Sequence, residues 1–259
     1  MKLGFIGMGN MAAALVRGFV ASGKVSADKI FAFDPAADKL AAMATELGIL
    51  PVSSERELAA ASDMVIMACK PYHVKGALAA MGEALSGKAL LSIALGWDHA
   101  AYRKELADDV RVQFVMPNTP AMVGEGMFLF EKTPSFTADE LAFATDLLAA
   151  IGVVETLPSE QMGIGGALSG CGPAFVDLLI EAFADAGVYY GLPRDKAYKL
   201  VSQTVKGSAK LQQQTGLHPG VLKDMVCSPA GSTIKGVAAL EHAGLRSACL
   251  AAIEAIMEG

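Results

Sequence analysis

The chain of 259 residues is long enough to bury one large core or two ordinary ones. Hydrophobic residues make up 53% and charged residues 19%, but no uninterrupted apolar run reaches the ~18 residues of a membrane span, so we interpret the excess as buried surface and a subunit interface. The net charge of −6, without any basic cluster, predicts no nucleic-acid partner, and the apolar pattern predicts no membrane partner.

Apolar runs alternate with helical patterns through the first half of the chain. Helical spacing covers residues 10–22 and 36–47, and the runs typical of buried strands cover 2–7, 30–33, 64–68, 89–93 and 110–115. This alternation favours right-handed crossovers and an α/β domain whose mostly parallel sheet has helices on both faces.

The second half of the chain reads as helical. After about Thr156 the β-branched runs stop, and helices are predicted over 173–190, 195–214, 221–226, 233–242 and 246–257. We therefore expect two domains, 1–156 and 157–259, the second of them all-α. Its first helix is apolar on nearly every side except for a stripe of Asp177, Glu181 and Asp185, so we expect it to be buried on most sides, in part by a second copy of the chain.

A glycine-rich loop follows the first predicted strand and opens the first helix. Residues 7–12, GMGNMA, fit the pattern G-x-G-x-x-G/A of dinucleotide-binding proteins. Such a loop brings backbone N–H groups and the positive end of a helix to a pyrophosphate. The candidate cofactor ligands here are Ile6, Gly7, Met8, Gly9, Asn10 and Met11; a plain strand-to-helix turn is the alternative.

Three further strand ends meet the same ligand edge of the predicted sheet. A carboxylate in the position of Asp34 typically accepts from the ribose 2′-OH of NAD and repels the 2′-phosphate of NADP, although an ordinary Asp-Pro turn is the alternative. The other two ends are predicted to line the nicotinamide and its ribose: Ala68, Cys69, Lys70 and Pro71, then Ala94 and Leu95. Lys70 alone is equally consistent with a solvated lysine.

The four cysteines and four histidines lack the spacing of disulfide or metal motifs, so we predict no metal site. The chain opens directly on a strand without a secretion signal, which predicts a cytoplasmic protein.

A small polar loop, CSPAGST at 227–233, lies between apolar helical segments. Thr233 is predicted to begin a helix with Gly231 and Ser232 at its cap, so the backbone N–H groups of this turn could hold a small anion. The alternative is a simple helix-turn-helix linker.

Taken together, these motifs resemble the pyrroline-5-carboxylate reductases. The resemblance spans the chain and rests on GFIGMGNMA (4–12), KP (70–71), MPNTPA (116–121), LSGCGPAF (168–175) and SPAGST (228–233). It implies a Rossmann domain followed by a helical dimerisation domain, and an enzyme that reduces 1-pyrroline-5-carboxylate to L-proline, the last step of proline biosynthesis, as a homodimer or higher homo-oligomer. Family precedent favours NADP as cofactor, whereas Asp34 argues for NAD.

The resemblance also implies residue roles. Thr233 would be the catalytic residue nearest the imine nitrogen, and Asn118 would lie near nicotinamide and substrate. The implied substrate ligands are Ser228, Gly231, Ser232, Thr233 and Asn118.

Three departures from the family pattern are Cys171 for Ser, Ala230 for Gly, and Asp34 itself. If residue 230 needs a positive φ, Ala230 is strained. A β-hydroxyacid dehydrogenase and a non-catalytic dinucleotide-binding regulatory protein are alternative functions; the first would need a lysine that the helix from Pro173 lacks.

Overall fold

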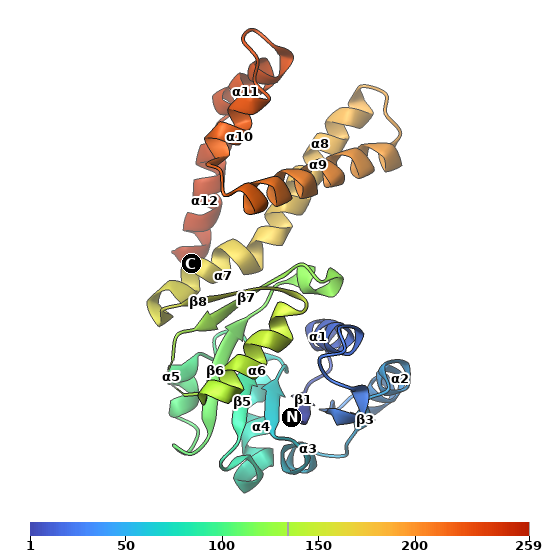
Figure 1. Cartoon of the computed structure of the whole chain (residues 1–259), viewed down its shortest axis with the longest axis vertical. Helices are drawn as coiled ribbons and strands as arrows, with labels where there is room; N and C mark the ends of the chain where they lie inside the picture. The colour runs from blue at the N-terminus through green and yellow to red at the C-terminus, as the bar shows by residue number, and fades with distance from the viewer. Residues whose placement is uncertain (134, 259) are drawn as a thin grey trace. The chain divides into compact units, whose positions relative to one another are not determined.

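The computed structural model describes residues 1–133 and 135–258. The chain divides into two compact units, Met1–Gly170 and Cys171–Gly259. The first holds an eight-stranded sheet with helices on both faces, and the described residues of the second form helices and their connections (Figure 1). The predicted fold class, a mostly parallel Rossmann sheet followed by an all-α region, is confirmed.

The strands of the first unit are β1 (Leu3–Ile6), β2 (Ile30–Phe33), β3 (Leu50–Pro51), β4 (Met64–Met67), β5 (Ala89–Ser92), β6 (Arg111–Met116), β7 (Gly126–Glu131) and β8 (Gly152–Leu157). Its α-helices are α1 (Asn10–Ala21), α2 (Ala37–Leu47), α3 (Glu55–Ala61), α4 (Val74–Met81), α5 (His99–Arg103), α6 (Ala138–Ala149) and α7 (Met162–Gly166). Five strands coincide with predicted runs, whereas β3, β7 and β8 were not predicted.

The strand order is β3-β2-β1-β4-β5-β6-β7-β8. All neighbours are parallel except β6 and β7, which pair antiparallel with Val115 opposite Phe130. Only a short connection through the 3₁₀ turn η4 (Thr119–Val123) joins β6 to β7, and parallel strands need a longer crossover. The order reverses between β1 and β4, and this switch point is where open α/β sheets bind ligands.

Two hydrophobic cores cover the two faces of the sheet. On one face α1, α2 and α6 pack on the strands, through residues such as Leu15, Leu40 and Leu147. On the other face α3, α4 and α5 contribute Leu58, Leu78 and Tyr102. The strands β1, β4 and β5 are buried along their whole length, which explains why the sequence shows them as continuous apolar runs.

The second unit consists of α8 (Gly172–Tyr189), α9 (Arg194–Thr215), α10 (Pro219–Met225), α11 (Ser232–His242) and α12 (Leu245–Met257). The helices α8 and α9 form a hairpin (Figure 1). Gly187 of α8 allows the two helices to approach closely, because a Cβ there would lie 3.3 Å from Cβ of Ala197 in α9. An ion pair between Asp185 and Arg194 closes the hairpin.

In the single chain the first helix of this unit is largely exposed, so its burial by a second copy of the chain stays a prediction. Ala184 is the one residue of α8 that is buried, while Leu178 is 65% exposed and Phe183 44%. By length and composition alone, the continuous helical segment Ser159–Tyr189 is apolar enough to cross a membrane. The sequence reading missed this because it counted only uninterrupted runs. The single chain therefore leaves the apolar surface of α8 uncovered.

Candidate active site

The glycine-rich loop lies between β1 and α1, at the point where the strand order reverses. Gly9 is the N-cap of α1, and no side chain among the described residues caps that helix. The first helical bond runs from Ala13 N to Gly9 O at 2.9 Å, so the N–H groups of Asn10, Met11 and Ala12 precede it and form the donor end of the helix. The loop has the features that a pyrophosphate requires.

Two glycines of this loop have different roles. Gly7 has φ +88°, and a Cβ there would lie 2.8 Å from Cα of Cys69, so only glycine fits between the ends of β1 and β4. A Cβ on Gly9 would meet no atom within 4 Å. The space beside Gly9 is open, which fits the close approach of a phosphate.

Asp34 joins the end of β2 to the same loop. Its Oδ2 accepts from the backbone N–H of Met8 at 2.8 Å, and its Oδ1 accepts from the N–H of Ala36 at 2.9 Å. The second bond is the Asx turn that the Asp-Pro alternative predicted, whereas the first was not foreseen. The carboxylate is therefore held in place at the edge where an adenosine ribose would bind.

The ends of β4 and β5 lie beside the loop, as their place in the sheet requires. Cys69 follows β4, and burial raises the pKa of its thiol to about 11, so it remains a neutral thiol near pH 7. Lys70 is exposed, Ala94 is buried and Leu95 is exposed. Residue Trp97, which sequence reasoning missed, donates from Nε1 to the carbonyl of Pro71 at 3.1 Å and ties the two strand ends together.

Asn118 follows β6 and has its side-chain amide bound to backbone groups on both sides. Its Oδ1 accepts from Met127 N at 2.8 Å, and its Nδ2 donates to Ser169 O at 3.0 Å. Ser169 lies in a π-helical turn, Ala167–Cys171, between α7 and α8. One Nδ2 hydrogen remains for a ligand.

The polar loop of the second unit is a helix N-terminus. Gly231 is the N-cap of α11, which begins at Ser232, and its N–H donates to Ser228 O at 3.0 Å. A Cβ on Gly231 would lie 2.4 Å from Oγ of Ser228, so glycine is needed there. No side chain of the described residues caps α11, and Ser228, Ser232 and Thr233 are exposed. Their hydroxyls and the free N–H groups form a set of donors suited to a carboxylate.

Ala230 in this loop has φ +59°, and it is the only non-glycine residue with positive φ among residues 1–133 and 135–258. The backbone strain that we predicted for Ala230, which replaces the glycine of the family pattern, is present. A residue with a Cβ in this region costs roughly 1–2 kcal/mol, so the surrounding loop must hold it there.

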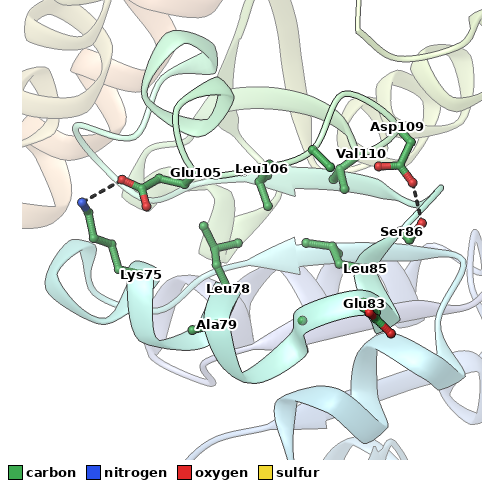
Figure 2. Close-up of a pocket in the computed structure, with 12 residues that line it drawn as sticks. Lys75, Leu78, Ala79, Glu83, Leu85, Ser86, Glu105, Leu106, Asp109 and Val110 are labelled. Atoms are coloured by element: carbon green, nitrogen blue, oxygen red, sulfur yellow. Dashed lines mark hydrogen bonds and ion pairs between the residues drawn. The ribbon is translucent and has the colours of Figure 1, made fainter.

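A separate groove lies between α4 and the segment that follows α5. It has a volume of 440 Å³ and an apolar floor that includes Leu78 and Leu106. Figure 2 shows the Lys75–Glu105 ion pair at one end and the Ser86–Asp109 hydrogen bond at the other. None of the predicted site residues lines it, so it is not the candidate active site.

Comparison with known proteins agrees with this geometry. Residues 159–259 match the family model described as pyrroline-5-carboxylate reductase dimerisation, and residues 2–96 match that of NADP oxidoreductase, coenzyme F420-dependent. The chain is 40% identical over 261 residues to a pyrroline-5-carboxylate reductase of Treponema pallidum, covering 99% of both chains.

Solved structures give the same result. The pyrroline carboxylate reductase of Plasmodium falciparum, solved with NADP bound, is 32% identical, covers 100% of this chain and 96% of its own, and has a TM-score of 0.90. The pyrroline-5-carboxylate reductase of Coxiella burnetii is 30% identical, with coverage of 99% and 96% and a TM-score of 0.92. Because the likeness covers both units and exceeds 30% identity over the whole length, the chain belongs to the pyrroline-5-carboxylate reductase family.

Proposed function

We propose that the protein reduces 1-pyrroline-5-carboxylate to L-proline with a hydride from NADPH or NADH, as the last step of proline biosynthesis in the cytoplasm. The observation that carries this proposal is the 40% identity, over the whole chain, to a reductase of that name. The hydrogen-bond donors at the start of α1 in the first unit and of α11 in the second give this proposal a physical basis.

The first unit would hold the dinucleotide. The pyrophosphate would meet the N–H groups at the start of α1, beside the open space at Gly9. The adenosine ribose would lie near Asp34, and the strand ends 68–71 and 94–95 would line the nicotinamide half. The P. falciparum reductase was solved with NADP bound, which supports NADP, while the fixed carboxylate of Asp34 disfavours a 2′-phosphate.

The second unit would hold the substrate carboxylate at the start of α11. The N–H groups of Ser232 and Thr233 and the hydroxyl of Ser228 are the donors that we assign to it. Thr233 would lie nearest the imine nitrogen and orient it.

The reaction adds one hydride to the imine carbon and one proton to the nitrogen. Reduced nicotinamide supplies the hydride. The protein has to keep the imine protonated, because an iminium is the better hydride acceptor, and to hold it against the cofactor. A hydroxyl of ordinary pKa is a weak acid, so we assign Thr233 to binding and orientation, with the proton coming from water.

We also propose that α8 forms the interface of a homo-oligomer. We propose no membrane partner and no nucleic-acid partner for the protein. The exposed apolar side chains of α8 lie within residues 159–259, the range of the dimerisation model, which supports this interface over a membrane span. The same range supports a functional domain boundary at 156/157, although the compact units divide at 170/171.

The decisive assay follows nicotinamide oxidation with racemic pyrroline-5-carboxylate and NADPH or NADH in parallel. Turnover with formation of proline supports the proposal. Absence of turnover with both cofactors, in a protein that binds them, would reject it in favour of the non-catalytic alternative. Turnover with 3-hydroxy acids and NAD⁺ but not with the imine would favour the β-hydroxyacid dehydrogenase, which the absence of lysine from α8 argues against.

A further inference from the structure

We infer that Asn118 is a positioning residue, which fixes the π-helical turn at the end of the first unit, rather than a ligand of cofactor or substrate. The inference goes beyond the proposed function, and its effect on turnover rests on that function.

The turn lacks a donor that an α-helix would supply. In an α-helix the carbonyl of residue 169 accepts from the N–H of residue 173, but residue 173 is proline and has no N–H. Asn118 Nδ2 donates to that carbonyl at 3.0 Å and takes the place of the missing donor. The π-helical form of Ala167–Cys171 and the asparagine therefore have a common cause in Pro173.

The amide group suits this position because it carries a donor and an acceptor on one short side chain. While Nδ2 donates to the turn, Oδ1 accepts from Met127 N at 2.8 Å at the start of β7. Asn118 is only 9% exposed, so these two hydrogen bonds are largely shielded from solvent. An ionised carboxylate in the same place could only accept, so it could not bond to Ser169 O.

Neighbouring contacts hold the turn against the same strand end. Met116 closes β6, and a Cβ on Gly166 would lie 2.8 Å from its Sδ. Ser169 Oγ donates to Gly165 O at 2.9 Å within the turn. The chain thus leaves the first unit from a fixed point beside the ligand edge of the sheet, where β6 ends parallel to β5.

The test uses Asn118→Asp in the full-length protein. The replacement keeps the acceptor for Met127 N but turns the donor facing Ser169 O into a second acceptor. We expect kcat to fall roughly tenfold to a hundredfold, as small misplacements of reacting groups do. The Kd of NADPH, measured by calorimetry, should stay within about threefold of wild type. Backbone amides of residues 162–172 should exchange hydrogen faster, and those of residues 2–33 should not.

A pH series gives a further readout. When the new carboxyl is protonated it becomes a donor again, so the ratio of variant to wild-type kcat should rise as the pH falls. The recovery supports positioning only if the urea midpoint shows that the variant is fully folded across the same pH range, because protonation would also relieve a burial penalty.

The matched control is Gln113→Glu in β6, the strand that Asn118 follows. The Gln113 amide is also buried and donates to two backbone carbonyls, those of Phe114 and Glu131, but it does not contact the turn. If this variant loses as much kcat as Asn118→Asp, the effect is loss of stability and the inference is wrong. It is also wrong if NADPH binding weakens in step with kcat/KM, because Asn118 would then contact the cofactor.

Failure of the proposed function is a separate outcome. If the wild-type protein does not turn over the imine, hydrogen exchange and NADPH binding still decide the role of Asn118. Faster exchange confined to residues 162–172 with unchanged NADPH binding would support the positioning role, and unchanged exchange there would overturn it.

Discussion

At the scale of single residues, Asp34 is the side chain that bears most directly on the choice of cofactor. It is fixed by two backbone N–H groups, so it cannot swing away without breaking the hydrogen bond to Met8. We expect Asp34→Asn to raise the ratio of kcat/KM for NADPH over NADH about tenfold, because a negative charge no longer faces the 2′-phosphate. Steady-state kinetics with both cofactors measures this ratio.

The control for Asp34→Asn is Asp28→Asn, which changes the net charge equally. Asp28 precedes β2, at the opposite end of that strand. The cofactor ratio should be unchanged in this variant. Equal shifts in both variants would mean that overall charge, and not Asp34, sets the preference.

Thr233 is the residue on which the proposed chemistry depends most. We expect Thr233→Ala to lower kcat by roughly 10- to 100-fold, the value of one hydrogen bond to a charged group, while the Kd of NADPH stays constant. Thr204→Ala is the matched control, because Thr204 Oγ1 donates to Leu200 O at 2.8 Å within the helix α9. Unchanged turnover in Thr233→Ala would remove Thr233 from the reaction.

Ala230 is a site of backbone strain. We expect Ala230→Gly to raise the free energy of unfolding by about 0.5–1 kcal/mol, because release of the strain at φ +59° exceeds the extra entropy of an unfolded glycine. Ala243→Gly, at a C-cap with ordinary φ −74°, should lower it instead. Urea midpoints of the two variants should therefore move in opposite directions.

At the scale of elements, α6 is held to the sheet by an ion pair that depends on pH. Arg111 donates to both carboxylate oxygens of Glu140, which also closes the capping box with Thr137. These hydrogen bonds, first those of Arg111, hold the pKa of the Glu140 carboxyl below its usual range. The Glu140 side chain is 12% exposed and that of Arg111 29%, so solvent screens this pair less than an ion pair on the open surface.

A carboxyl whose pKa is lower in the folded state stabilises the fold above its unfolded pKa, and this contribution is lost as pH falls through the folded pKa. We expect Glu140→Gln to cost about 1–3 kcal/mol at pH 7 and progressively less in acid. Glu46→Gln, which breaks the exposed pair with Arg17, should cost less than about 0.5 kcal/mol. Urea unfolding of both variants from pH 7 down to about pH 2 measures the difference, because the loss occurs below the ordinary glutamate pKa.

Elements buried on both faces were predictable from sequence, whereas elements shaped by their neighbours were not. The strands β1, β4 and β5 show as apolar runs because both of their faces are covered. The edge strand β8 alternates half-buried and exposed residues, so it lacks that signal. The contact of Asn118 with the π-helical turn escaped prediction because its partner Ser169 is 51 positions away in sequence.

The candidate site was predictable in part. The loops at Gly7 and Gly231 follow from local rules, since each needs glycine for a turn or a close approach. The double use of the Asp34 carboxylate and the bond between Trp97 and Pro71 were not foreseeable, because they depend on which strand ends become neighbours.

At the scale of the whole molecule, the exposed apolar face of α8 should decide the oligomeric state. We expect Leu178→Glu to shift the protein towards monomers and to reduce its activity, because a buried unpaired carboxylate in the interface is costly. Sedimentation measures the shift. Val153→Glu, at an exposed apolar residue of β8 outside the dimerisation range, is the control and should leave the oligomer intact.

The hydrogen bond between Trp97 and Pro71 has a spectroscopic consequence. Trp97 is the only tryptophan of the chain, so its fluorescence comes from one place, at two strand ends that we assign to the nicotinamide. Its emission overlaps the absorption of reduced nicotinamide, so binding of NADPH should quench it by energy transfer. Oxidised cofactor absorbs at shorter wavelength and should quench it less. The fluorescence intensity of Trp97 should therefore report, without any added label, whether the bound cofactor is reduced or oxidised.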